Sequence, residues 1–314
     1  MTRIVMLYCA FAACVVVLLS GAVVVRRLVD GRRHRRDALL SRQYLHIVIL
    51  SLMSETDTVP HFPRLESAGA RMVLAETLAR LVSSTYGLDL GPLRRIFRDA
   101  GLQPYLLRCA RRTRGFRRAR CLSLLSRLPA DAVVAAAVER YGSDRHRAVR
   151  FYALMVQLAA DPSMALQLIG AYPDPLSAFE LSEIVSMLRR GVLPVAYEPL
   201  IESPNRNLRS LGIAIVRQFG IEEAEENLLR IASEDTTGEL GREALYALCA
   251  LRRPMARREV VRRMGLMSRA ERRALLRCMA LEGYSETAFG SPVGDEETPY
   301  FESFVLSYKR CLVC

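Results

Sequence analysis

The chain has 314 residues, enough to bury a substantial core, and it is rich in Ala, Leu, Arg and Glu, which favour helices. Alternating β-branched stretches are scarce, so the composition indicates an all-α protein and argues against a sheet-based fold. The net charge of +12 is local, because residues 26–36 hold six Arg and one Asp and residues 94–120 hold ten Arg and one Asp.

The first segment, Ile4–Val25, contains no charged residue. As a helix it would be about 33 Å long, which matches the hydrocarbon core of a bilayer. We therefore expect residues 1–25 to form an uncleaved transmembrane anchor. A cleaved signal peptide is the alternative, but only Arg3 precedes the apolar run, and Val23–Val25 continue it past the small residues that a peptidase would need.

A cluster of arginines follows this segment directly. Lys and Arg beside a span are retained on the cytoplasmic side. The pattern therefore predicts a single-pass protein of a bacterial inner membrane, with its N-terminus outside and the rest of the chain in the cytoplasm. The same side chains are expected to contact anionic lipid headgroups, unless they serve only to set the topology. They are Arg26, Arg27, Arg32, Arg33, Arg35 and Arg36.

The next stretch, residues 38–54, is strongly apolar but contains Arg42 and His46. Its longest uncharged run is too short to span a bilayer. It is therefore expected to be an amphipathic helix that packs on the first repeat or lies at the membrane interface, with a second span as the alternative. A polar loop with prolines ends this linker region, 26–63.

From residue 64 onward, a short apolar stripe of helical spacing recurs along the chain. The marker positions of six copies lie 28 to 32 residues apart, a period in the range of solenoid repeats. The clearest copy lies within Asn205–Gly220, where a glycine inside the stripe would let a neighbouring helix approach closely. The six markers are Cys121, Ala153, Ile184, Gly212, Ala244 and Leu275.

Between the markers lie segments that predict partner helices, separated by Gly and Pro. These segments are 131–141, 162–172, 194–201, 222–233, 255–264 and 284–289. The segments 208–220 and 148–159 resemble the second helix of a HEAT repeat, and Asp144 precedes Arg150 by six residues, as in the Asp–Arg pairing of that family. The resemblance implies an α-solenoid of about six to seven helical pairs; a non-repeat helical bundle is the alternative.

Three further helices are expected at the start of this repeat region, over 65–86, 93–102 and 105–114. The last two carry much of the second arginine-rich stretch, which is either a basic platform for lipid or an acidic partner, or a solvated helix face. The repeats are predicted to end near residue 292. Residues 293–314 are expected to form a helix that caps the open end of the stack.

Catalytic motifs are missing from the sequence. There is no Walker loop, dinucleotide-binding glycine motif, HExxH or GxSxG, and the four histidines are scattered. We therefore expect no enzyme activity, no metal and no cofactor. A HEAT-type lyase stays as an alternative without assignable residues.

The predicted function is a membrane-anchored interaction scaffold or regulatory subunit that binds a partner protein of the inner membrane. Partner recognition is expected on the surface formed by the second helices of the repeats. The residues predicted to face the partner are Arg147, Glu180, Arg206 and Arg242. A basic solenoid that binds nucleic acid or anionic lipid is the alternative, and nucleic acid is the less favoured partner because few aromatic residues interleave the arginines.

Overall fold

The structure is a computed structural model that describes residues 2–53, 62–63, 65–85, 90–128, 131–189, 196–235, 238–284 and 297–313. At positions 2–17, 19, 22–26, 28–29, 33, 90 and 308–313 it describes the backbone without the side chain. Every regular element in this part of the chain is helical, so the predicted all-α class is confirmed. The chain divides into two compact units, Met1–Arg140 and Tyr141–Cys314, a boundary that the sequence analysis does not predict.

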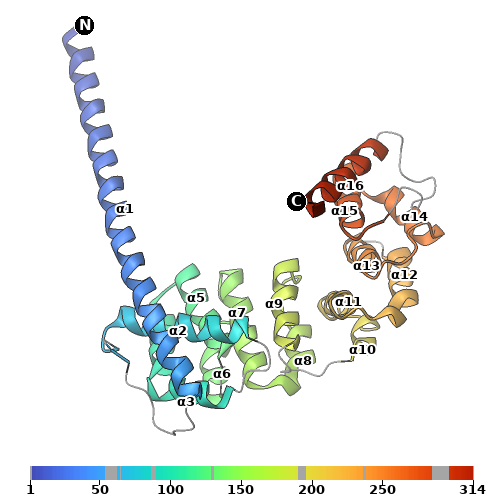
Figure 1. The fold of residues 1–314 in the computed structure, drawn as a ribbon, viewed down its shortest axis with the longest axis horizontal. Helices are drawn as coiled ribbons and strands as arrows, with labels where there is room; N and C mark the ends of the chain where they lie inside the picture. Colours follow the sequence, from blue (N-terminus) through green and yellow to red (C-terminus); the bar gives the residue numbers. More distant parts are fainter. Residues whose placement is uncertain are drawn as a thin grey trace. The chain divides into compact units, whose positions relative to one another are not determined.

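The first unit is built around α2, which packs against α1 on one side and against α5 on another (Figure 1). Helices α4 and α5 form a hairpin, and α3 packs on α4. Ser67 caps α2 by accepting a hydrogen bond from the Ala70 N–H, at 3.1 Å. The helices of this unit are α1 (Thr2–Met53), α2 (Ala68–Ser84), α3 (Leu90–Asp99), α4 (Leu102–Arg112), α5 (Gly115–Arg127) and α6 (Ala132–Glu139).

The C-terminal part of α1 packs on the first unit, as predicted for residues 38–54. Leu40, Tyr44 and Val48 follow each other at one-turn intervals and are buried, so they form one apolar stripe against the unit. Two polar contacts add to this packing: Ser41 Oγ lies 2.9 Å from Thr77 Oγ1, and the Tyr44 hydroxyl donates to the Pro63 carbonyl at 2.7 Å. Residues 38–53 therefore pack on the following helices, one of the two placements expected for them, as the C-terminal part of one long helix.

The predicted membrane anchor and inner-membrane localisation are contradicted. Among the residues that the structure describes, no helix is both long enough and apolar enough to cross a bilayer. Helix α1 runs on without a break from the first segment into the arginine-rich one (Figure 1). The physical reason for the correction is that the described side chains of α1 include exposed charges such as Arg27, Asp30 and Arg32, so this part of the helix is too polar to cross. Of Ile4–Val25, only Leu18, Ser20 and Gly21 have described side chains.

The six arginines predicted to contact lipid headgroups lie on this helix. The side chains of Arg27, Arg32, Arg35 and Arg36 are exposed, as such a contact would require. Those of Arg26 and Arg33 lie outside the described residues. Headgroup contact by this cluster therefore stays a prediction.

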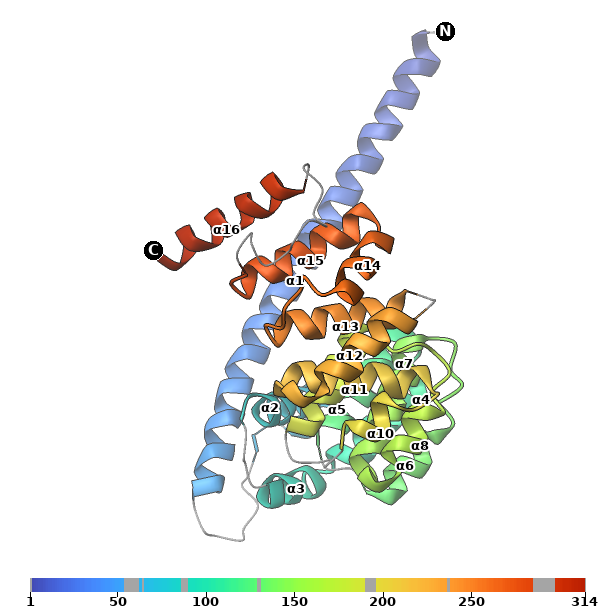
Figure 2. The ribbon, with the colours of Figure 1, turned by 90° about the vertical axis from the view of Figure 1, so that its right-hand side faces the viewer.

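The second unit consists of two rows of helices. In one row α11 packs against α9, α13 against α11, α15 against α13 and α16 against α15. In the other row, α10 packs on α11, α12 on α13 and α14 on α12. Figure 2 shows α15, α13 and α11 lying one below another. The helices are α7 (Arg147–Ala160), α8 (Ala165–Gly170), α9 (Ala178–Arg189), α10 (Glu198–Ile201), α11 (Arg206–Phe219), α12 (Glu225–Glu234), α13 (Glu239–Ala250), α14 (Arg258–Leu266), α15 (Arg269–Leu281) and α16 (Thr298–Val313).

The six markers of the sequence repeat lie on six different helices, α5, α7, α9, α11, α13 and α15, and all six are buried. Because the period reflects burial against neighbouring helices, each stripe faces the interior. In the second unit the stripes contribute to two hydrophobic clusters, the first from α7 to α11 and the second from α10 to α16.

Among the described residues, helices lie in five of the six predicted partner segments; 222–233 is helical throughout, and the helix at 131–141 is shorter than expected. Within 194–201 only Glu198–Ile201 is a described helix, and 162–172 divides into a 3₁₀ turn, Pro162–Met164, and α8. Most of the predicted helix at 284–289 lies outside the described residues. The predicted C-terminal helix is α16, and its Phe301 is buried against the second cluster.

Gly212 confirms the expectation of a close helix approach. A Cβ atom at this position would lie 2.8 Å from Ile201 Cγ1, 3.0 Å from Ile201 N and 3.0 Å from Leu200 Cβ. Helix α10 therefore approaches the backbone of α11 so closely that no side chain fits between them.

Candidate partner-binding groove

A groove of about 590 Å³ runs along the second unit and is lined by residues of α7, α9, α11 and α13, together with the segment that leads into α9. Its apolar lining comes mainly from α9 and α11, with one aromatic ring from α13. These apolar residues are Leu176, Leu181, Val185, Ile213, Ala214 and Tyr246. A groove of this volume accommodates several side chains of a bound segment.

Three of the arginines that line the groove are each paired with a glutamate of a following helix. Arg147 Nη2 lies 2.5 Å from Glu180 Oε2, and its Nε donates to Glu180 Oε1 at 3.0 Å. Arg206 forms an ion pair with Glu239. On the following helix, Arg242 Nη1 donates to Glu271 Oε1 at 2.8 Å. The partners are separated by 29 to 33 residues, so each pair joins equivalent turns of successive helical pairs.

The structure thus brings together the four residues that the sequence singled out for partner binding. Arg147, Arg206 and Arg242 line the groove, and the side chain of each is about two-fifths exposed. Glu180 is buried and accepts hydrogen bonds from Arg147. Their guanidinium groups can therefore bind a partner while they hold their own glutamates.

Glu180 does not face solvent, contrary to the prediction, because it is only 5% exposed. Besides Arg147, its Oε2 accepts hydrogen bonds from the N–H and the hydroxyl of Ser177, both at 2.8 Å. The Ser177 hydroxyl in turn accepts from the Glu180 N–H at 3.3 Å. This is a capping box, and the pattern Ser177-x-x-Glu180 would have predicted it from the sequence.

These contacts set the charge of Glu180. Burial raises the pKa of this carboxyl, but the hydrogen bonds from Arg147 and Ser177 outweigh burial, so its pKa lies below the usual value. The same pairing raises the pKa of Arg147. The pair is therefore ionised around neutral pH.

Replacing Glu180 with glutamine is expected to lower the free energy of unfolding by about 2 kcal/mol at pH 7, because charged hydrogen bonds of this kind contribute about that amount. A depressed pKa stabilises the fold above the unfolded value of about 4.3, and this contribution is lost as the pH falls through the folded value. The difference between the two proteins should therefore shrink below about pH 4. Urea unfolding across pH measures it. A pH-independent difference would contradict this account, and the exposed Glu234→Gln serves as the control.

Several polar residues that line the groove were not predicted from the sequence, among them Ser210, Arg217 and Glu243. Glu243 accepts a hydrogen bond from Ser210, and burial raises the pKa of its carboxyl. Its Oε2 atom is buried without a hydrogen-bond partner. Arg217 is exposed on α11 and has no acceptor among the described residues. Within the described part of the chain, Arg217 is therefore a donor that the groove offers to a partner, whereas the unpaired Glu243 oxygen is buried.

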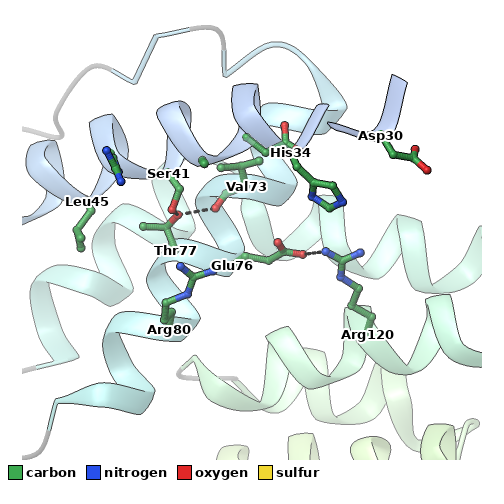
Figure 3. A pocket seen from close by; sticks show the side chains of 12 residues that line it. Asp30, His34, Ser41, Leu45, Val73, Glu76, Thr77, Arg80 and Arg120 are labelled. Carbon is green, nitrogen blue, oxygen red and sulfur yellow. Dashed lines mark hydrogen bonds and ion pairs between the residues drawn. The ribbon is translucent and has the colours of Figure 1, made fainter. Parts of the chain in front are cut away.

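A second cavity, also of about 590 Å³, lies in the first unit between α1, α2 and α5. Figure 3 shows Glu76 of α2 turned toward Arg120 of α5, with which it forms an ion pair, while Asp30 and His34 of α1 border the same space. Its lining mixes acidic and basic groups that largely neutralise each other. Across the described residues, no three His, Cys, Asp or Glu side chains are arranged to hold a metal ion.

Of the two cavities, the groove has the clearer chemistry. It combines an apolar floor with arginines at its edge. Comparison with models of known protein families and with curated proteins found no match to this chain.

Proposed function

We propose that this protein is a HEAT-like α-solenoid that acts as an interaction scaffold or regulatory subunit, without catalytic activity, and binds a segment of a partner protein in the groove of α7, α9, α11 and α13. The observation that carries the proposal is the convergence of apolar side chains and arginines from four successive helices on one groove.

The assignment to a solenoid is supported by the two rows of helices in the second unit. In one row α9, α11, α13 and α15 each pack on the next, and α10, α12 and α14 pack on the other side of the same pairs. Arg150 supports the HEAT resemblance, since it donates to the Asp144 carbonyl at 2.6 Å and to Asp174 Oδ2 at 2.6 Å. Arg150 is therefore bonded both to the turn before α7 and to Asp174, in the segment that leads into α9.

The groove indicates the chemistry of the partner. Leu181 and Ile213 form an apolar floor and are themselves buried, and Tyr246 beside them is half-buried, so the groove favours apolar side chains of a partner. Among the described residues the Arg217 guanidinium has no acceptor, so it can bind a carboxylate of the partner. An amphipathic helix with an acidic edge meets these requirements, because it presents apolar residues on one face and carboxylates beside them.

Ser182→Trp tests this proposal. Ser182 is exposed and lines the groove, so an indole there occupies the space intended for the partner and leaves the core intact. A partner that copurifies in stoichiometric amount with the wild-type chain should be lost at least tenfold with this variant. Quantitative mass spectrometry of the copurified proteins measures the loss.

The matched control is Ser233→Trp, which places the same bulky side chain on the exposed surface of α12, away from the groove. Partner recovery should be unchanged with this control, and circular dichroism should show the same helix content in both variants. If Ser182→Trp retains the partner in full, the groove is not the binding site.

A further inference from the structure

The connection between α4 and α5 in the first unit is a compact turn that exposes arginines together with one aromatic ring. Arg111 and Arg112 end α4, and Arg114 immediately precedes α5. Phe116 and Arg117 lie in the first turn of α5. Because only seven residues span this segment, the five side chains emerge from one small surface, which we call the α4–α5 tip.

The backbone of the tip is held in place by internal contacts. Arg118 Nε donates to the carbonyls of Ala110, at 3.0 Å, and of Thr113, at 2.9 Å. The Thr113 hydroxyl donates to the Cys109 carbonyl at 2.8 Å. Gly115 has a φ of +56°, a conformation that other residues adopt at a cost. The turn is therefore preorganised, with Arg118 directed back onto the main chain.

The other four arginines of the tip have no such internal role. Arg111, Arg112, Arg114 and Arg117 are exposed, and none of them contacts an acceptor among the described residues. This distinguishes them from arginines elsewhere in the unit, such as Arg120, which is paired with Glu76. The tip thus carries four positive charges that the described part of the protein does not neutralise.

Phe116 stands among these arginines and is 81% exposed, the highest value of any large hydrophobic side chain in the described part of the chain. An exposed aromatic ring gains free energy when a partner removes it from water. The α4–α5 tip therefore combines an uncovered apolar group with uncovered positive charges.

We propose that the α4–α5 tip binds an anionic lipid surface, with the guanidinium groups on phosphate headgroups and Phe116 inserted at the boundary between headgroups and acyl chains. The contact is peripheral and requires no spanning helix. Each arginine near an anionic surface is attracted to it, and an aromatic ring is favoured at the interface. The exposed arginines of α1 lie in the same unit as the tip. Helix α5, which begins at the tip, also borders the cavity beside α1, because Arg120 of α5 lines that cavity together with Asp30 and His34 of α1 (Figure 3).

Single-stranded nucleic acid fits the tip less well. Such ligands are bound by a series of aromatic side chains on which successive bases stack. In the arginine-rich helices of the first unit, Phe97 is buried at 2% exposure, and the Tyr105 hydroxyl donates to the Ala68 carbonyl at 2.7 Å. Phe116 is left as one stacking surface, which suits insertion into lipid better than binding along a strand.

Flotation of the full chain with vesicles tests the proposal. The lipid-specific signal is the difference in binding between vesicles of equal parts phosphatidylcholine and phosphatidylglycerol and vesicles of phosphatidylcholine alone. Arg114→Glu with Arg117→Glu should weaken this specific binding at least about tenfold, since two attractive charges become repulsive. Phe116→Ser should weaken it about threefold or more through the loss of the inserted ring.

Two matched control variants make the same change in net charge, or remove a similar exposed ring, at sites away from the tip. Arg145→Glu with Arg258→Glu changes the net charge equally at exposed arginines of the second unit, and Phe179→Ser removes another exposed aromatic ring, 60% exposed. Both controls should bind anionic vesicles like the wild type. Equal binding by the wild type and the Arg114/Arg117 variant would overturn the proposal. The proposal would also be overturned if the wild type retained a labelled single-stranded oligonucleotide and the Arg114/Arg117 variant lost the oligonucleotide but kept its binding to vesicles. That result would favour nucleic acid instead.

Discussion

Gly212→Val is expected to lower the free energy of unfolding by about 3 kcal/mol or more, because it overpacks the contact between α10 and α11. Even a Cβ atom would stand 3.0 Å from the Ile201 nitrogen and from Leu200 Cβ. These atoms belong to or adjoin the backbone of α10, so a change of side-chain rotamer cannot make room for valine. The two helices must separate, and their shared apolar contacts weaken. Urea unfolding followed by circular dichroism measures the change.

Gly265→Val is the matched control for this prediction. Gly265 lies within α14 of the same unit, and a Cβ atom built there meets no atom within 4 Å. Valine is a slightly better helix former than glycine, so the free energy of unfolding should stay within about 0.5 kcal/mol of the wild type. If both glycine variants behave alike, the close approach of α10 to α11 is not what Gly212 permits.

Arg263→Leu is expected to destabilise the protein by about 3–5 kcal/mol, the usual cost of removing one partner from a buried ion pair. The side chains of Arg263 and Asp235 are 8% and 5% exposed, with Nη2 and Oδ2 3.6 Å apart. Arg263 Nη1 also donates to the Asp235 carbonyl at 2.8 Å, and Asp235 Oδ2 accepts from the Gly241 N–H at 2.8 Å. Leucine fills part of the space but removes the positive charge of Arg263 from beside the buried carboxylate.

A second substitution distinguishes the stranded charge from lost packing. Adding Asp235→Asn to Arg263→Leu removes the charge and keeps an oxygen acceptor for Gly241, so part of the lost free energy of unfolding should return. Arg262→Leu, at the exposed neighbouring position, should change the stability by less than about 0.5 kcal/mol. A loss below about 1 kcal/mol with Arg263→Leu would contradict the role assigned to the buried pair.

The helical stack of the second unit was largely predictable, and Gly212 illustrates why. Its stripe, with those of Ala153, Ile184, Ala244 and Leu275, recurs because each helix must bury one face against its neighbours. The periodicity of a sequence records that burial, so the stripes predicted the helices and the burial of the marker residues. The ends of two stripes, Phe219 and Leu281, are nevertheless exposed. The breakers between the stripes likewise placed the turns to within a few residues.

The groove was predictable only in part. Arg147, Arg206 and Arg242 were recognised as surface residues of the second helices, and they do line one groove. Their pairing with glutamates 29 to 33 residues away was not predicted, because many arginines and glutamates recur at such intervals. Glu180 shows the consequence, since a glutamate expected in solvent is buried by its capping box and its arginine.

Local patterns in the chain were sufficient for the helical class, the inward stripes and the tight contact at Gly212, because helix formation and amphipathicity depend on residues only a few positions apart. The burial of Arg263, the groove and the uncovered charges of the α4–α5 tip depend on which distant residues meet. Whether a charged side chain is neutralised is settled by neighbours from other helices, and the chain order does not specify those neighbours.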